Sequence, residues 1–445
     1  MEILMKKNSV SIGKSAVFFL LAAFASNAHS YTFTPTVGVK VEQHSNVGKD
    51  TANQEDTIVA PFVAFDYKEA NSTISTAVNF NATHEEYLDD TFSSLNLVDI
   101  NAFADWRIIP ERFIWAFDDF ATTQRISAID TSSPDNLQTV NVFSTGPDFV
   151  FSEGIWSLLG KFRYGDTNYS ETDEDSVFYG GSFAVQREIN EYSRIASGVI
   201  YRTNDFDEAS LSDYDVGKIF IDYARDLPSG KLLVGIGASY ADINNEKDDT
   251  EPYFKLLLSY QPTGLFTVDL SAVNEFSDDA GRAYDATSSR QTGKQKAGTG
   301  LDESTQPGVY RSRKASLTGK YSASLFSWDI TGFLAEKSFV EGGQFDVVEG
   351  TGFDTEEVGA EANVAWLLSE RMTFNIGGSY KETDYPVEAF TDEEYKASAS
   401  LGYRITRNLF TSVGVSREEK QSNDVAREFD DDVVFFSLFY KGGVK

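Results

Sequence analysis

Polar and apolar residues alternate along many segments of this chain, each about 10 to 16 residues long. In one of them, Ile74, Val78 and Phe80 would lie on one face of a strand, and Asn79 and Asn81 on the other. A period of two predicts a β-strand that separates two environments. A strand that crosses a bilayer in a barrel needs about 9–11 residues, so these segments are long enough to span a membrane.

The connections between these segments alternate between tight and long. The tight ones are Lys68–Asn71, Ile108–Arg112, Ser152–Gly154, Glu188–Tyr192, Asp226–Gly230, Gln261–Gly264, Ser322–Ser324, Ser369–Arg371 and Thr406–Asn408. The long ones are Ser45–Asp56, Leu88–Ser94, Ile126–Leu137, Tyr169–Asp175, Asp205–Asp213, Asn244–Thr250, Ser277–Gln306, Gly342–Asp354, Tyr385–Asp392 and Ser422–Arg427. Short periplasmic turns and long external loops are typical of outer-membrane hairpins. The sequence therefore predicts an all-β fold, a transmembrane up-and-down antiparallel β-barrel of about 20 strands, within a range of about 18–22.

Composition excludes several other classes of protein. The chain has no cysteine, which excludes disulfides, zinc–thiolate sites and thiol nucleophiles. Its 69 acidic residues outnumber its 38 basic residues, a poor balance for binding nucleic acid. The mean hydropathy of −0.30 argues against a helical membrane protein, but a barrel with one polar face averages to such a value. Most of the acidic excess lies in the long connections, which predicts an acidic external rim.

The first residues have the order of a secretory signal peptide. Lys6, Lys7 and Lys14 precede an apolar run over 16–25, and small residues follow at Ala28 and Ser30. We therefore expect a signal peptide over 1–30 and an outer-membrane β-barrel over 31–445. The expected location is the cell outer membrane of a Gram-negative bacterium.

Aromatic residues gather beside the tight turns, as they do in the interfacial girdle of a membrane barrel. They are Tyr67, Trp106, Phe113, Trp115, Phe151, Trp156, Tyr260, Phe266, Tyr321, Phe326, Trp328, Trp366, Phe374, Tyr403 and Phe410.

The sequence offers little for catalysis or for metal binding. Of three histidines, His84 is followed by Glu85 and Glu86 at the end of a strand, and we expect it to be a surface residue. Acidic clusters such as 173–175 and 430–432 lack the EF-hand spacing, and we expect a solvated rim that contacts lipopolysaccharide through divalent cations. We predict no catalytic, cofactor-binding or metal-binding residues, no cofactor, and a protein that is not an enzyme.

The connection over 277–306 is the longest, and it is rich in Gly, Ser and Thr. It carries Arg282, Arg290, Lys294 and Lys296. Two hypotheses stay open for it. It is either a plain external loop or a segment that folds into the lumen, as a constriction or to bind an anionic chain.

Charged residues inside the strand segments are the candidates for a solute path. A Lys or Arg on the lipid face near the midplane costs about 2–4 kcal/mol, so such residues are expected in the lumen or at a rim. The candidates are Lys161, Arg163, Arg202, Lys218, Lys255, Arg311, Arg313 and Lys381.

Four stretches resemble a known family. They are TFTPTVGVKVEQHSNVGKD (32–50) with the following EDTIVAPFVAFDYKEANSTISTAVNFNATHEEYLDD (55–90), ADWRIIPERFIW (104–115) and EEYKASASLGYRITRNLFTSVGVSREEKQSN (393–423). They are similar to the EpsL-like, porin-like outer-membrane barrels found beside exopolysaccharide and PEP-CTERM (exosortase) systems. The resemblance implies a role in moving or organising a surface polysaccharide.

Together these observations predict a porin-like channel for export of a surface exopolysaccharide. Two alternatives are a general or sugar-specific uptake porin and a non-conducting barrel that anchors surface matrix. The expected partners are outer-membrane lipid and lipopolysaccharide, the polysaccharide, the barrel-assembly machinery and periplasmic export components, with no nucleic acid.

Overall fold

The computed structural model describes residues 31–127, 130, 133–172, 174–208, 211–243, 247–278, 308–340 and 354–443. The strands are β1 (Tyr31–His44), β2 (Asp56–Ala70), β3 (Ile74–Tyr87), β4 (Leu95–Ile109), β5 (Phe113–Arg125), β6 (Leu137–Glu153), β7 (Trp156–Tyr169), β8 (Ser176–Asn190), β9 (Ser193–Phe206), β10 (Tyr214–Leu227), β11 (Gly230–Ile243), β12 (Lys247–Thr263), β13 (Phe266–Ser277), β14 (Tyr310–Ser322), β15 (Phe326–Phe339), β16 (Thr355–Ser369), β17 (Met372–Tyr385), β18 (Phe390–Arg404), β19 (Leu409–Ser422) and β20 (Phe429–Lys441). Short 3-10 helices, η1 (Pro134–Asn136) and η4 (Val425–Arg427), lie in two of the connections. No helix among these residues is long and apolar enough to cross a membrane.

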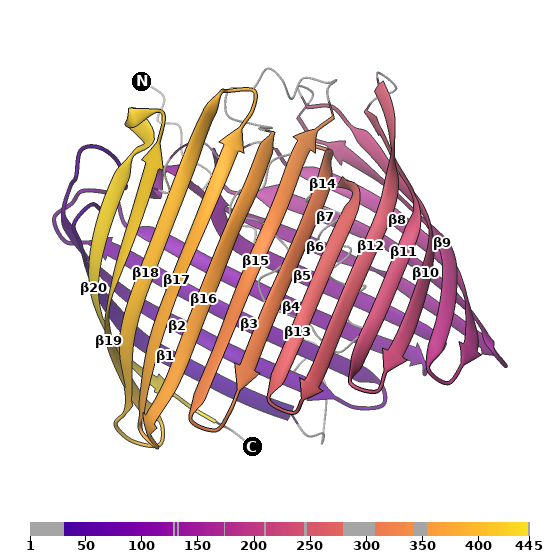
Figure 1. The fold of residues 1–445 in the computed structure, drawn as a ribbon, viewed down its shortest axis with the longest axis horizontal. Coiled ribbons are helices and arrows are strands. Elements are labelled where there is room, and N and C mark those ends of the chain that lie inside the picture. Colours follow the sequence, from indigo (N-terminus) through magenta and orange to yellow (C-terminus); the bar gives the residue numbers. More distant parts are fainter. Residues whose placement is uncertain are drawn as a thin grey trace, which may run out of the picture.

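The twenty strands close into one barrel (Figure 1). Each strand pairs antiparallel with the next, and β20 pairs back onto β1, from Thr36 opposite Lys441 to His44 opposite Val433. Closure pairs the backbone N–H and C=O groups of the first and last strands, which is the condition for a sheet to stand in hydrocarbon. The predicted all-β, up-and-down antiparallel barrel is confirmed, with a strand number of 20.

The predicted alternation of tight and long connections holds at most of the hairpins. Tight turns lie at one end of the barrel, the lower end in Figure 1, which we call the short-turn end. Only Glu191 and Tyr192, for example, separate β8 from β9. The opposite, long-loop end carries the other connections. The predicted signal peptide over 1–30 lies outside the described residues, so the domain division stays a prediction.

Two predicted long loops are shorter than expected, because acidic sequence continues the β-ladder. The prediction for 244–250 is wrong at its end, since β12 begins at Lys247 and its acidic start is offset by Arg311, which binds Asp249 and Glu251. The prediction for 385–392 is wrong at both ends, since β17 reaches Tyr385 and β18 starts at Phe390. The rings of those two residues pack with centroids 4.4 Å apart.

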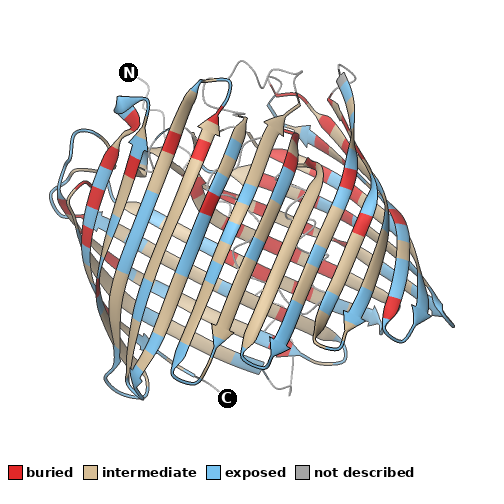
Figure 2. Ribbon diagram, viewed as in Figure 1, coloured by how far each residue is buried: buried red, intermediate tan, exposed pale blue. Residues whose placement is uncertain are grey.

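The two faces of the wall are distinguished by exposure along β20. Val434 and Phe436 are 55% and 48% exposed, whereas Asp431 and Ser437, on the opposite face of the same strand, are 1% and 8% exposed. The exposed apolar set is the lipid-facing side, because it continues through paired residues such as Val37, which lies opposite Tyr440. Figure 2 shows that exposed positions recur along the strands in front. The other set lines the lumen.

The aromatic girdle lies on the outer face near the short-turn end, with one exception. Exposed members are Trp106, Phe151, Trp156, Tyr260, Phe326, Trp366 and Tyr403. Neighbouring rings stack, as Phe113 does on Phe149, with centroids 5.0 Å apart. The prediction is wrong for Phe410, which alternates with the lipid-facing Val413 and Val415 and therefore points into the lumen.

Candidate functional site

The inner wall of β16 to β20 and β1 is built from rows of residues that follow the direction of the backbone hydrogen bonds. One row toward the long-loop end, which we call the charged row, contains Glu361, Ser379, Lys396, Glu418 and Asp431. Below it, the polar wall contains Asn363, Gly377, Ser398, Ser416, Asn375, Ser400, Gly414, Gly402, Ser412 and Ser437, with Val433 and Phe435 at the β20 end of two of its rows. The lowest row, which we call the aromatic row, contains Phe410, Phe439 and Phe62 with Gly38 between the last two. One wall therefore changes from charged to polar to aromatic along the barrel axis.

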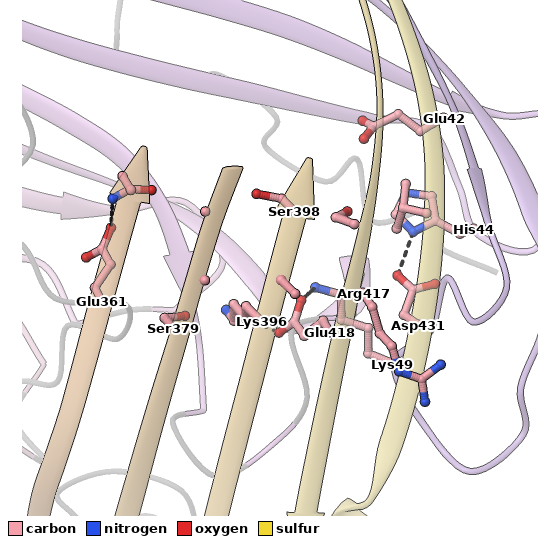
Figure 3. Close-up of a pocket in the computed structure, with 16 residues that line it drawn as sticks. Glu42, His44, Lys49, Glu361, Ser379, Lys396, Ser398, Arg417, Glu418 and Asp431 are labelled. Atoms are coloured by element: carbon pink, nitrogen blue, oxygen red, sulfur yellow. Dashed lines mark hydrogen bonds and ion pairs between the residues drawn. The ribbon is translucent and has the colours of Figure 1, made fainter. Parts of the chain in front are cut away.

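The charged row lines a cleft of about 370 Å³ that opens into the lumen (Figure 3). Glu418 accepts from two lysines, with Lys49 Nζ at 2.8 Å and Lys396 Nζ at 3.2 Å. His44 Nδ1 lies 2.8 Å from Asp431 Oδ2, which fixes the end of β1 against β20. The cleft thus presents amines and carboxylates that are largely neutralised by one another.

A buried ionic cluster lies beside the charged row at the long-loop end. Asp392 on β18 accepts from Lys420 Nζ at 2.8 Å and also binds the guanidinium of Arg427 in η4. The same guanidinium stacks on Phe390, 4.1 Å from the ring centroid, and on Tyr385 at 5.4 Å. This cluster ties the connection between β19 and β20 to β17 and β18, so it holds the rim above the cleft.

The polar wall is made of small side chains that bond to one another. Ser412 and Ser437 hydroxyls are 2.7 Å apart across β19 and β20. Asn363 Nδ2 donates to Glu361 Oε1 at 2.9 Å. Hydroxyls and amides on short side chains offer hydrogen bonds without filling the lumen, so such a wall suits water and hydroxylated solutes.

Across the lumen, the hairpin formed by β13 and β14 leans inward at its long-loop end. Pairing of β12 with β13 runs from the turn up to Phe254 opposite Asn274, and beyond that point β13 packs on the inner face of β11. The N–H of Phe276 donates to Ser239 Oγ at 3.2 Å. Asp278 accepts from Tyr214 Oη at 2.7 Å and from Arg202, 76 residues away in the chain. Both ends of the long connection therefore start inside the wall, while residues 279–307 lie outside the described part of the chain.

Most of the predicted path residues have carboxylate partners. Lys218 Nζ lies 2.6 Å from Glu275, and Lys381 Nζ lies 3.7 Å from Glu394. Arg311 binds Glu251 at 2.5 Å, because the inward tilt of the hairpin brings the outer side of β14 against the inner side of β12.

Arg163 and Arg313 differ from the expectation of a lumen-lining cation. Arg163 is 1% exposed and donates to Asp148 at 2.6 Å and to the carbonyls of Gly146 and Phe162, which fills an interruption in the ladder of β6 and β7. Arg313 shares the outer face of β14 with Leu317 and binds Glu336 at 3.1 Å.

Lys161 and Lys255 lie on the inner face by register, opposite Asp148 and Gly235. The structure does not bring the predicted residues together in one site. They are neighbours only as three pairs, which are Lys161 with Arg163, Arg202 with Lys218, and Arg311 with Arg313. Lys381 alone lies beside the charged row. Whether any of them contacts a solute stays a prediction.

The sequence did not indicate the cleft as a site, although Asp431 belongs to the acidic cluster 430–432. The stretch from Glu394 to Ser400 alternates Glu, Lys, Ser and Ser on one face, and this signal of a small polar inner face was available. His84 is a surface residue as expected, with Nδ1 2.9 Å from Asn96 Oδ1 and its side chain 46% exposed. In the part of the chain that the structure describes, no group of three or more His, Asp or Glu residues is arranged to hold a metal ion.

Residues 344–441 match a protein-family model. Its description is "Putative beta-barrel porin 2". The matched segment contains β16 to β20, the strands that carry the charged row and the polar wall. A closed barrel with an even number of antiparallel strands and an apolar outer face is the outer-membrane fold, and the porin match agrees with it.

Several solved structures are similar to the chain at low sequence identity. A mutant of the ferric enterobactin receptor PfeA from Pseudomonas aeruginosa is 11% identical, with 94% of this chain and 82% of that chain covered and a TM-score of 0.49. The copper transporter OprC is 10% identical, with coverages of 92% and 80% and a TM-score of 0.47. The FrpB iron transporter from Neisseria meningitidis is 10% identical, with coverages of 92% and 81% and a TM-score of 0.47. No curated protein matches the chain.

Proposed function

We propose that this protein is a non-enzymatic outer-membrane channel for a hydrophilic solute, and that its cargo is a surface exopolysaccharide leaving the cell. The observation that carries the proposal is the polar wall of β16 to β20, where small hydroxyl and amide side chains cover an inner face between two mouths of the barrel. A sugar chain carries many hydroxyls, so it exchanges hydrogen bonds with such a wall at little net cost and slides without being held.

The charges of the lumen support the same cargo. Glu418 with Lys396 and Lys49, and Lys218 with Glu275, are opposite charges at close range. A wall of paired charges has no strong field of one sign, which favours a neutral or weakly acidic polymer over a small ion of either sign. The lipopolysaccharide, assembly machinery and periplasmic partners expected from the sequence are part of this proposal.

Conductance and secretion test the proposal together. The purified protein in a planar bilayer should form an ion-conducting pore, and deletion of its gene should abolish secreted matrix polysaccharide. If the purified protein conducts but deletion of its gene leaves polysaccharide secretion normal, the alternative of an uptake porin is favoured. Liposome swelling with small sugars would then measure its uptake. A protein that gives no conductance would be a structural barrel that anchors matrix.

A further inference from the structure

Aromatic side chains form a row on the inner wall, where a water-filled channel calls for polar groups. Phe410 and Phe439 stack with ring centroids 5.4 Å apart and planes within 12° of each other. Phe62 on β2 follows, with its centroid 6.4 Å from that of Phe439. The three rings thus extend from the short-turn end of β19 and β20 to the middle of β2, across four adjacent strands.

Glycine in the intervening strand leaves room for these side chains. A Cβ added at Gly38 would be 2.5 Å from Phe439 Cβ and 2.7 Å from Phe62 Cζ, so the side chains of both phenylalanines occupy the space above that glycine. Gly414 is covered by the ring of Phe435 in the same way, with Cζ 2.5 Å from a Cβ built there. The rings of Phe62 and Phe435 thus pack over glycines of the same wall, and all four rings are only partly buried.

The surroundings of these rings select the class of ligand. Ser412 and Ser437 place two hydroxyls in the row directly above Phe410 and Phe439. The ammonium of Lys40 lies 5.2 Å from the centre of Phe435 and 2.7 Å from Glu42. A pyranose ring has a face of C–H groups, which carry partial positive charge and pack on the negative face of an aromatic ring, and an edge of hydroxyls, which bind serine, lysine and carboxylate.

We propose that the aromatic row and Phe435 form a carbohydrate-stacking site that receives a sugar chain at the short-turn mouth of the lumen. This proposal rests on the proposed channel function and specifies how the entrance of the channel binds its solute. The chain stacks its C–H faces on Phe410, Phe439 and Phe62, and then passes Phe435 toward the polar wall. A purely apolar solute would leave the adjacent hydroxyls and charges unused, and a bare ion would find no partner on the phenyl faces.

Inward rings elsewhere in the barrel provide matched controls. Phe333 on β15 covers Gly359, with Cζ 2.4 Å from a Cβ built there, and Phe220 on β10 comes within 2.9 Å of the same position at Gly198. Each packs over a glycine as the row does. Loss of either ring therefore reports the structural role of such a phenylalanine.

The test is single-channel recording of the full-length protein, with maltohexaose added from the short-turn side as a neutral probe. The wild-type channel should show brief sugar-dependent current blocks. The double variant Phe62→Leu/Phe439→Leu should shorten the blocks several-fold, and the blocks of Phe333→Leu should last as long as those of the wild type. Heat-modifiable migration on gels checks that each variant is folded.

Three results would overturn the proposal. A conducting wild-type channel without sugar blocks refutes the site and leaves the channel standing. Equal shortening in Phe333→Leu, or none in the double variant, shows that the rings only fill space above glycines. A wild-type protein without conductance refutes the channel, and this inference falls with it.

Discussion

Glu418 on β19 faces Lys396 on β18 directly across the strand pair, with Oε1 3.2 Å from Nζ, and its other oxygen lies 2.8 Å from Nζ of Lys49. One carboxylate therefore neutralises two ammonium groups at the wall of the cleft (Figure 3). Glu418→Gln leaves both lysines without this partner, so we expect the reversal potential in a salt gradient to shift toward anion selectivity. Lys396→Gln should shift it toward cations.

Glu419→Gln is the matched control, because Glu419 is the next residue and lies on the outer face, where it binds Arg417 at 3.3 Å. Its selectivity should equal that of the wild type. Equal shifts for Glu418→Gln and Glu419→Gln would show that the cleft does not face the ion path.

A methyl group at Gly38 should destabilise the barrel. The Cβ of Gly38→Ala would approach Phe439 and Phe62 to 2.5 and 2.7 Å, and overpacking of this kind costs about 1–3 kcal/mol. The midpoint of urea unfolding in detergent, followed by heat-modifiable migration, should fall. Gly332→Ala, where a Cβ meets nothing within 4 Å, should leave it unchanged.

The buried ionic cluster of Asp392, Lys420 and Arg427 should be a main source of stability at the long-loop end. Asp392→Asn removes the carboxylate that Lys420 and Arg427 both bind, and the three side chains are 1%, 2% and 9% exposed. Breaking a buried pair by removing one partner costs about 3–5 kcal/mol, so the thermal unfolding temperature in detergent should drop clearly. Asp430→Asn, whose side chain is 52% exposed, should change it little.

Adjacent residues on β17 should respond oppositely to the same substitution. Ile376 is 49% exposed on the lipid-facing side, and an arginine there costs about 2–4 kcal/mol near the midplane, so Ile376→Arg should lower the yield of folded barrel in liposomes. Asn375 faces the polar wall, opposite Ser400. Asn375→Arg should fold normally and reduce conductance, and equal folding defects in the two variants would contradict the assignment of faces.

The hairpins could be predicted from sequence because their signals are local. Alternation sets which residues share a face, and Pro, Gly and Asn beside charged residues end a strand, so tight turns such as 228–229 between β10 and β11 were found. Alternation does not say which face is inside. Phe410 was therefore assigned to the girdle. The turn over 405–408 instead sets the register of β19 on β18 so that Phe410 faces the lumen.

Partners distant in sequence could not be predicted. Arg202 meets Asp278 because the upper part of β13 leans across β11, and nothing near Arg202 in the chain signals that. The same tilt brings Arg311 against Glu251, and this ion pair offsets the acidic start of β12. Six of the eight charged residues predicted for the solute path thus have carboxylate partners that the sequence did not indicate.

The sequence by itself determined the class of fold, the number of strands to within about two and the sorting of loops, because each depends on residues a few positions apart. Only the tertiary structure decided what the lumen is made of. The register of neighbouring strands, from β16 through β20 and β1 to β2, sets two rows. One contains Glu361, Ser379, Lys396, Glu418 and Asp431, and the other contains Phe410, Phe439 and Phe62. Closure of β20 on β1 joins the two ends of the chain into that single wall, and a contact of this range leaves no local pattern in the residues that make it.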